Sequence, residues 1–220
     1  MFEVIHRDDN LLVLNKPADV SVLADRSGAP CLWDGLEAFL MQKPYLVHRL
    51  DKPTSGVLLV ALNPGTQSRL TRAFQARQVR KFYLAWVTGD PGAAGLIDLP
   101  LKKGRKSRYR VAGPRESIIE RNRRWTLGAD TADGHPSLTR FRTLRREAER
   151  TLLLLAPLTG RTHQLRVHLS WIGYPIVGDR LYGKPGNPVQ QAARLMLHAH
   201  RIVLPEDGSH AAPTGADWVL

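Results

Sequence analysis

The chain of 220 residues contains one cysteine, Cys31. A single thiol cannot form an internal disulfide or supply a cysteine-based zinc site, so a reducing compartment fits the chain best. No apolar run approaches the roughly 18 residues that a membrane-spanning helix needs. The first residues, MFEVIHRDDN, carry acids where an export signal has Lys or Arg. We therefore expect a cytoplasmic protein with no membrane segment.

Acidic residues are scarce relative to basic ones. Asp and Glu number 20 against 32 Lys and Arg, which gives a formal net charge of +12. Such a charge balance favours a polyanionic partner, and it favours nucleic acid over a membrane surface. Hydrophobic residues make up 43% and charged residues 24%, as in an ordinary globular protein, so the composition excludes a disordered chain.

Short apolar segments of strand length recur along the sequence, with few helical segments between them. Strands are predicted at residues 2–6, 11–15, 45–50, 57–61, 81–88, 137–144, 151–157 and 195–204. Helices are predicted at residues 32–41, 67–76 and 162–172. The pattern indicates an α+β fold with a mostly antiparallel mixed sheet and flanking helices and loops.

No linker of Pro, Gly and Ser divides the chain, so we expect a single domain over residues 1–220. Residues 102–110, KKGRKSRYR, form a basic run, and residues 112–136 show no steady period. Residues 205–220 read as a polar tail.

An acid follows the apolar segment 45–50, in the sequence His48-Arg49-Leu50-Asp51-Lys52-Pro53-Thr54-Ser55-Gly56. Turns on a rigid scaffold often carry catalytic groups, and Arg49 and Lys52 would hold the Asp51 carboxylate ionised. If the strand continued to the turn, alternation would place Arg49 and Asp51 on one face. The simpler interpretation is that Asp51 begins a turn and accepts bonds from the following amides, and this segment alone favours it.

The helix at residues 162–172 begins with polar and basic residues, Gly160-Arg161-Thr162-His163-Gln164. Thr162 is a candidate cap, and the free amides together with Arg161 favour an anion at this end. Arg166 lies one turn further, within reach of a buried carboxylate. The alternative is a capped helix with a solvated arginine.

The segment 81–88 alternates, which places Tyr83 and Lys81 on the face opposite Phe82 and Leu84. Tyr83 would then be able to stack on a base, although an ordinary strand aromatic is the simpler interpretation.

Two other patterns fail as sites. Gly178-Asp179-Arg180-Leu181-Tyr182-Gly183-Lys184-Pro185 nearly matches a phosphate-binding loop, but Pro185 replaces the hydroxyl that would hold Mg²⁺, so we interpret it as a turn. The pairs His163/His168 and His198/His200 lack the spacing and the third ligand of a metal site, so structural roles are predicted and no metal site is expected.

Taken together, these segments resemble the motifs of the RluA-type RNA pseudouridine synthases. The resemblance rests on HRLDKPTSGVLLVA at 48–61, KFYLAWVTG at 81–89, GRTHQLRVHLSWIGYPIVGDRLYG at 160–183, LMLHAHRIVL at 195–204 and NKPADVSV at 15–22. The segments follow the order of the family and span about residues 10–204.

The resemblance implies roles for particular residues. It makes Asp51 the nucleophilic acid, Arg166 its partner and Tyr83 the residue that stacks on the target uracil. It also implies that Leu165 lines the base pocket and that Arg49 fills the space left by a flipped base. The further predicted substrate-binding residues are His48, Arg161 and His163.

The implied reaction needs no cofactor or metal, because isomerising uridine to pseudouridine involves no redox step. The implied partner is RNA, either a tRNA or a large-subunit rRNA stem-loop, and we expect a monomer with no nucleotide cofactor. The additional RNA-binding domain that precedes the catalytic domain in many relatives is not expected here. The competing hypothesis is a non-catalytic RNA-binding module or RNA chaperone of the same descent.

Overall fold

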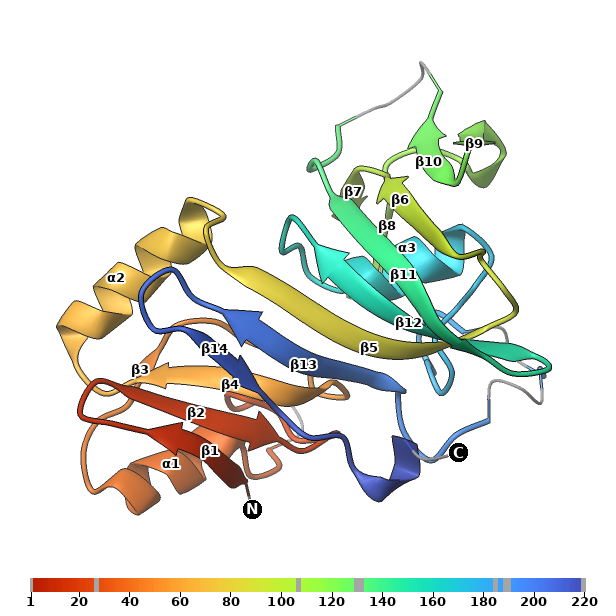
Figure 1. The fold of residues 1–220 in the computed structure, drawn as a ribbon. Helices are drawn as coiled ribbons and strands as arrows, with labels where there is room; N and C mark the ends of the chain where they lie inside the picture. The colour runs from red at the N-terminus through yellow and green to blue at the C-terminus, as the bar shows by residue number, and fades with distance from the viewer. Residues whose placement is uncertain are drawn as a thin grey trace. The chain divides into compact units, whose positions relative to one another are not determined.

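The computed structural model describes residues 2–25, 28–105, 108–128, 133–183, 186–187 and 191–218. The chain forms two compact units, one of Met1–Lys81 with His198–Leu220 and the other of Phe82–Leu197. The chain leaves the first unit in β5 (Arg80–Thr88) and returns to it in β13 (Leu197–Val203), as Figure 1 shows. Among the described helices, none has the length and apolar character to cross a membrane.

The first unit centres on a mixed sheet. Its other strands are β1 (Glu3–Arg7), β2 (Leu11–Lys16), β3 (Tyr45–Leu46), β4 (Ser55–Ala61) and β14 (Ser209–Ala211). Strand β2 pairs antiparallel with β1 and β4, and β3 pairs antiparallel with β4. Strand β13 runs parallel to β4 at His198 and Ala199 and pairs antiparallel with β14 further along, at Arg201–Val203. Two strands far apart in the sequence therefore meet directly after the Asp51 turn.

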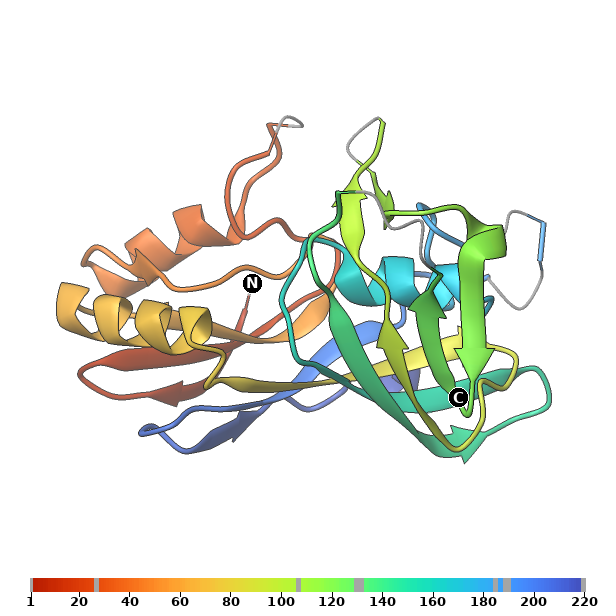
Figure 2. The same ribbon diagram turned by 90° about the horizontal axis from the view of Figure 1, so that it is seen from above.

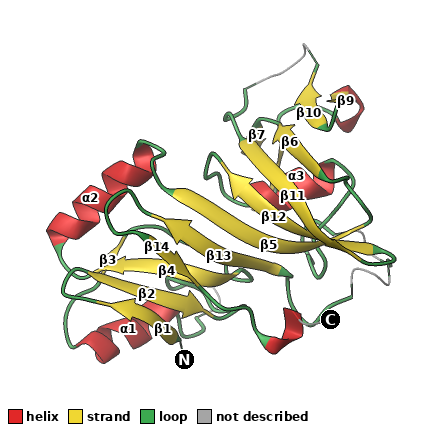
Figure 3. Cartoon of the chain, in the orientation of Figure 1, coloured by secondary structure: helices red, strands yellow, loops and turns green. Residues whose placement is uncertain are grey.

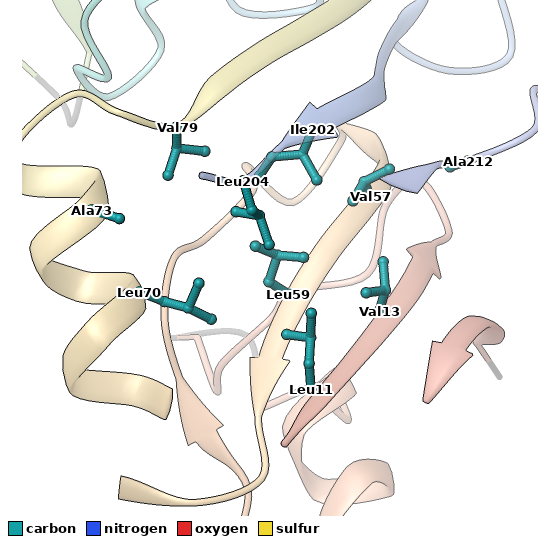
Figure 4. Packing of buried hydrophobic residues seen from close by; sticks show 10 residues of the cluster. All are labelled: Leu11, Val13, Val57, Leu59, Leu70, Ala73, Val79, Ile202, Leu204 and Ala212. Atoms are coloured by element: carbon teal, nitrogen blue, oxygen red, sulfur yellow. The ribbon is translucent and has the colours of Figure 1, made fainter. Parts of the chain in front are cut away.

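The core of this unit explains why β2 and β4 are continuous apolar runs. Every residue of Leu11–Leu14 and of Val57–Ala61 is buried, as expected for central strands covered on both faces. One face packs against α2, and Figure 4 shows how side chains from the helix, β2, β4 and β13 meet there. The cluster consists of Leu11, Val13, Val57, Leu59, Leu70, Ala73, Val79, Ile202, Leu204 and Ala212.

The two helices of the first unit begin close to where the sequence predicts them. Helix α1 spans Leu32–Leu40 and α2 spans Pro64–Gln75. The side-chain oxygen of Asn63 accepts a bond of 2.9 Å from the Thr66 amide, and Pro64 occupies the first helical position. Both features are typical of a helix start, which is why α2 begins three residues before the predicted boundary.

The second unit is built on a longer and mainly antiparallel sheet, coloured yellow in Figure 3. In spatial order its strands are β5, β12 (Arg150–Pro157), β11 (Leu138–Arg146), β6 (Ala94–Asp98), β10 (Arg124–Leu127) and β9 (Ile118–Arg121). Only the β6–β10 pair is parallel. Strands β7 (Leu101–Lys103) and β8 (Tyr109–Val111) form a separate hairpin over the predicted basic run. Of that run, Lys106 and Ser107 lie outside the described residues.

Helix α3 (Gln164–Trp171) lies against one face of this sheet, beside β11 and β12 in both Figure 1 and Figure 2. A buried polar network attaches it there. The Gln164 side chain donates to the Leu138 carbonyl and to Thr139 Oγ1 and accepts from Thr159 Oγ1. His168 bonds the Leu99 carbonyl through Nε2 and Thr139 Oγ1 through Nδ1, both at 2.9 Å.

The carbonyl of Leu99 can only accept, so it fixes the proton of His168 on Nε2 and leaves Nδ1 to accept from Thr139. Burial lowers the pKa of His168 to about 4, which keeps the ring neutral as this bonding pattern requires. The network orients the helix that carries Arg166.

The α+β class with a mostly antiparallel mixed sheet is confirmed, while three local predictions were wrong. The strand predicted at residues 45–50 ends at Leu46. Helix α3 begins after His163, which takes a left-handed φ of 56° and makes no side-chain cap, so Thr162 is not the cap. The predicted polar tail contains β14 and a 3-10 turn, Ala216–Trp218, whose Trp218 is buried. The prediction of a single domain over residues 1–220 stays a prediction.

Candidate active site

Asp51 lies in the turn that connects β3 to β4. The Thr54 amide donates a bond of 3.0 Å to the Asp51 backbone carbonyl, which closes the turn. The neighbours Leu50 and Thr54 are buried, whereas Asp51 is half-buried. The turn therefore lies in the core of the unit at both ends and brings a carboxylate to the surface between them.

Lys16 holds this turn from inside the unit, a role that the sequence reasoning missed. Its side chain is fully buried, and its ammonium donates to the carbonyls of Pro17 at 2.7 Å, Val20 at 2.8 Å and Lys52 at 3.1 Å. A buried ammonium is tolerated only when such partners satisfy it. The Lys52 carbonyl belongs to the residue after Asp51, so the contact fixes the path of the backbone there. The available signal was a lysine at the end of the apolar strand LLVLN.

His48 fixes the other end of the turn. Its Nε2 accepts a bond of 3.0 Å from the Leu59 amide of β4, and its ring stacks on Phe74 with centroids 5.0 Å apart. The imidazole thus takes the place of a backbone acceptor, which explains why β3 stops two residues earlier. Burial, with a smaller effect of the Lys81 charge, lowers the pKa of His48 to about 3. A neutral ring bonded in this way is an anchor for the segment that carries Arg49.

The two basic residues beside Asp51 differ in their surroundings. Lys52 pairs with Asp25 at 2.9 Å, and both side chains are partly exposed. The Arg49 side chain is exposed and forms no ion pair with any residue that the structure describes. Because residues 47–54 are not a strand, the alternation that would place Arg49 and Asp51 on one face does not apply. Arg49 is nevertheless accessible to a ligand.

Gly56 is required where the turn enters β4. It pairs with Ala199 of the parallel strand β13 and has φ of 112°. A Cβ atom at this position would collide with the Ala199 backbone. Beside it, Ser55 Oγ bonds His198 Nδ1 at 2.9 Å, and His198 Nε2 bonds the Ala212 carbonyl at 3.2 Å. The predicted structural role of His198 is thereby confirmed, and the start of β4 is joined to the last strand.

Arg166 of the second unit is buried and paired, so the interpretation as a solvated arginine was wrong. Its Nε donates to Asp179 Oδ2 at 2.9 Å and its Nη2 donates to Oδ1 at 2.8 Å, which is the bidentate arrangement that suits a guanidinium. Asp179 Oδ1 also accepts from the amides of Leu181 and Tyr182. The turn predicted at residues 178–185 is confirmed over Gly178–Gly183, while residues 184 and 185 lie outside the described residues. Its acid, Asp179, pairs with Arg166.

Tyr182 of the same turn links Arg166 to the basic hairpin. The guanidinium carbon of Arg166 lies 5.1 Å from the centre of the Tyr182 ring. The Tyr182 hydroxyl accepts from the Tyr109 amide of β8 at 2.9 Å and bonds His163 Nδ1 at 2.8 Å. The same hydroxyl therefore holds both the start of β8 and the residue that precedes α3. The predicted substrate-binding residue His163 is thus part of the support around Arg166.

The remaining predicted site residues lie on β5 and at the start of α3. Tyr83 is half-buried and is paired with Leu155, whose side chain is on the α3 side of the sheet. Leu165 is buried on α3, and Arg161 is exposed with its amide donating to Gln164 Oε1 at 3.0 Å. Across the described part of the chain, no three His, Cys, Asp or Glu side chains gather as metal ligands.

Comparison with known proteins places the chain in a family. Residues 10–171, which contain Asp51, Tyr83 and Arg166, match the model of a family described as RNA pseudouridylate synthase. The chain belongs to the RNA pseudouridylate synthase family.

Individual relatives agree with this assignment. The chain is 37% identical to an uncharacterized RNA pseudouridine synthase of Zymomonas mobilis, over 90% of this chain and 85% of that protein. It is 34% identical to the dual-specificity RNA pseudouridine synthase RluA of Escherichia coli K12, over 91% of this chain and 85% of that one. The solved structure of human RNA pseudouridylate synthase domain containing 4 superposes with a TM-score of 0.78 at 27% identity, covering 99% of this chain and 90% of that chain.

Proposed function

We propose that the protein isomerises uridine to pseudouridine in RNA and that Asp51 is its nucleophile. The observation that carries this proposal is the Asp51 turn, which lies inside the family match and is fixed by Lys16 on one side and by His48 on the other. A carboxylate held in one place is what covalent catalysis at a sugar carbon requires. The target base is stacked in RNA and has to be flipped out before the carboxylate can reach it.

In the proposed reaction, a carboxylate oxygen of Asp51 forms a bond to C1′ while the C1′–N1 bond breaks, and the electron pair leaves with the uracil. The base turns, its C5 forms a bond to C1′, and the bond to Asp51 breaks. The proton on C5 is then lost and N1 is protonated. The alternative through a glycal begins with loss of a proton from C2′. The glycal route gives the same product, and the proton on C5 is lost in it as well.

The other residues have supporting roles in this proposal. Arg166 orients the Asp51 carboxylate, Tyr83 stacks on the flipped uracil, and Leu165 lines the base pocket. Arg49 occupies the space that the base leaves, for which an exposed guanidinium is suited because it both stacks and bonds phosphates. Arg161 and the basic hairpin β7–β8 bind phosphates of the RNA.

We further propose that the substrate is a short stem-loop in tRNA, in large-subunit rRNA or in both. The support for this finer statement is the resemblance of the motifs to RluA-type enzymes and the basic charge of the chain. A small catalytic chain grips a small footprint around the target uridine, which favours a compact stem-loop as the segment that the active site binds.

The test is release of tritium from RNA labelled at C5 of uridine. The proposal expects release with the wild-type protein and none with Asp51→Asn at equal RNA occupancy. Binding without any release by the wild-type protein, across tRNA and rRNA transcripts, would instead identify a non-catalytic RNA-binding module.

A further inference from the structure

The sheet of the second unit has a second face, on the side away from α3. Residues alternate along β11, and Thr139, which bonds His168, and the buried Phe141 point to the α3 side. Arg140 and Arg142 therefore point to the opposite side, and both are exposed. Figure 1 shows β11, β6, β10 and β9 as neighbours in this part of the unit.

The strand register extends this basic surface across four strands. Arg140 of β11 is opposite Leu96 of β6, Leu96 is opposite Arg124 of β10, and Arg124 is opposite Arg121 of β9. Directly opposed residues have their side chains on the same face of a sheet. We use the name arginine face for the exposed set Arg121, Arg124, Arg140 and Arg142.

The arginine face carries positive charge that the described residues do not neutralise. Arg124 pairs with Asp98 at 2.8 Å, whereas no described carboxylate pairs with Arg121, Arg140 or Arg142. Like charges directly opposite each other, such as Arg121 and Arg124, destabilise a sheet. An anion that covers the arginine face would therefore reduce this repulsion and stabilise the sheet.

The end of β11 provides a contrast within one strand. Beyond the irregularity between Thr143 and Arg145, the arginines are matched by acids. Arg145 pairs with Glu147 at 3.0 Å, and Arg146 pairs with Asp90 at 3.0 Å. Among the described residues, the arginines of this strand thus pair with carboxylates beyond Thr143 and do not do so at Arg140 and Arg142.

We propose that the arginine face binds the phosphates of an RNA segment separate from the segment that holds the target uridine. This inference rests on the proposed function, which supplies RNA as the partner. Neighbouring strands lie about 4.8 Å apart, so Arg121 and Arg124 are adjacent and Arg140 is about 10 Å from Arg124 across β6. Planar guanidinium groups at such spacings suit successive phosphates.

The two RNA segments must be distinct because the surfaces face opposite ways. Tyr83 is paired with Leu155 and Leu155 with Phe141, which places Tyr83 on the α3 side of the sheet. A nucleotide stacked on Tyr83 is therefore on the other side of the sheet from Arg140 and Arg142. Only an RNA longer than the target stem-loop reaches both faces.

The double variant Arg140→Thr/Arg142→Thr tests the inference, because Thr suits a strand and carries no charge. Dissociation constants are measured by fluorescence anisotropy for a short stem-loop and for a long folded transcript of large-subunit rRNA. For the long RNA we expect a loss of about tenfold at physiological salt and a log–log salt slope shallower by roughly 1.5, as for two lost phosphate contacts. Affinity for the stem-loop should remain that of the wild type.

The matched control is Arg145→Thr/Arg146→Thr, which removes the same charge from the same strand where carboxylates already pair with it. Its effect on the long RNA should be clearly smaller. Arg121→Thr, on another strand, should reproduce about half of the change in slope. Circular dichroism and thermal unfolding confirm that each variant folds before its affinity is compared.

Unchanged affinity of the double variant for the long RNA would overturn the inference. So would an equal loss for both RNAs, since that indicates general attraction and not a separate segment. Tritium release from the stem-loop at saturating enzyme should be the same in the double variant and the wild type. If the wild type itself releases no tritium but the two RNAs are discriminated as expected, the proposed function fails and the arginine face stands.

Discussion

The turn that carries Asp51 and the helix that carries Arg166 are stabilised by different kinds of contact. The Asp51 turn is held mainly through backbone atoms, by Lys16 donating to carbonyls and His48 accepting from an amide. Arg166 is held through its own side chain by a buried carboxylate, that of Asp179. The first arrangement fixes where the acid lies, and the second fixes the orientation of the guanidinium itself.

This difference predicts how each region responds to substitution. The carboxylate of Asp51 can be altered without disturbing the contacts that hold its backbone. Arg166 cannot be altered without breaking the pair with Asp179. A change at Asp51 should therefore separate chemistry from folding, whereas a change at Arg166 should affect both.

The largest effect is expected for Asp51→Asn. The amide has nearly the same size but cannot act as the nucleophile, so turnover should fall to background while stability and RNA affinity stay near wild type. Tritium release, urea unfolding and RNA binding on the same preparation measure the three properties. Wild-type release by the purified variant would mean that another group is the nucleophile.

Arg166→Lys should be the next most severe. Lysine keeps the charge but loses the planar fork that bonds both oxygens of Asp179. Breaking a buried pair costs about 3–5 kcal/mol of stability. The misplaced ammonium should also lower the single-turnover rate by about a hundredfold or more, as displacements of about 1 Å near the reacting groups do. The control is Arg180→Lys, because Arg180 is exposed and adjacent to Asp179 in the sequence. This variant should change neither the single-turnover rate nor the stability. Retention of most of the rate by Arg166→Lys would remove Arg166 from the proposed mechanism.

Lys16→Met tests the support of the Asp51 turn. It leaves three carbonyls without their donor, at about 1–3 kcal/mol for each buried group that stays unsatisfied. We expect a loss of a few kcal/mol in urea unfolding and a slower single turnover, because the backbone next to Asp51 is released. Lys52→Met removes only a partly exposed pair with Asp25 and should cost less than about 1 kcal/mol. Equal losses for the two variants would contradict the role of Lys16.

Each region also contains a neutral histidine with a lowered pKa, the half-buried His48 in the first unit and the buried His168 in the second, which predicts sensitivity to acid. The pKa is lowered to about 3 for His48 and about 4 for His168, from 6.5, so the unfolded chain binds protons that the folded chain does not. Stability should be complete above about pH 6.5 and fall as the pH drops toward 4.

For the fully buried His168 the total loss is on the order of 3 kcal/mol. His168→Gln keeps a donor and an acceptor but does not titrate. The difference in unfolding free energy between pH 7 and about pH 4.5 should therefore be smaller in this variant. If the difference is unchanged, His168 is not the group responsible.

The smallest and most selective effect is expected for Arg49→Ala. Flipping a base costs a few kcal/mol, and least where the base is already unstacked. The variant should lose much activity on a structured stem-loop and clearly less on an RNA whose target uridine lies in a disordered loop. Single-turnover rates at saturating enzyme compare the two, and equal fractional losses would assign Arg49 to general binding.

The sequence predicted the elements that follow a strong hydrophobic pattern. Strands β2, β4, β11 and β12 and helices α1 and α2 appear within a few residues of their expected bounds, because burial and periodicity determine them locally. The strand at residues 45–50 was overestimated because its apolar pattern continues after His48 has replaced the backbone partner of Leu59.

Contacts between distant residues could not be predicted from local patterns. The partner of Arg166 is 13 residues away in a turn, and Lys16 contacts Lys52 across 36 residues. The C-terminal residues appeared polar, yet β14 pairs with β13, and Trp218 is buried with its ring 5.8 Å from that of His198. The candidate acid was identified through the resemblance of its motif to a known family, whereas its support required the fold.

The discontinuity of the first unit has a consequence for the order in which the chain acquires its structure during synthesis. Residues 82–197 form one uninterrupted stretch and can fold while the ribosome still holds the remainder. The parallel strand beside Gly56 is supplied by residues 197–203, which are synthesised after the whole of the second unit. The Asp51 turn is translated before the second unit, but it acquires its neighbouring strand only after that unit, so a ribosome-bound fragment that ends before residue 197 should not hold the Asp51 turn in its final setting.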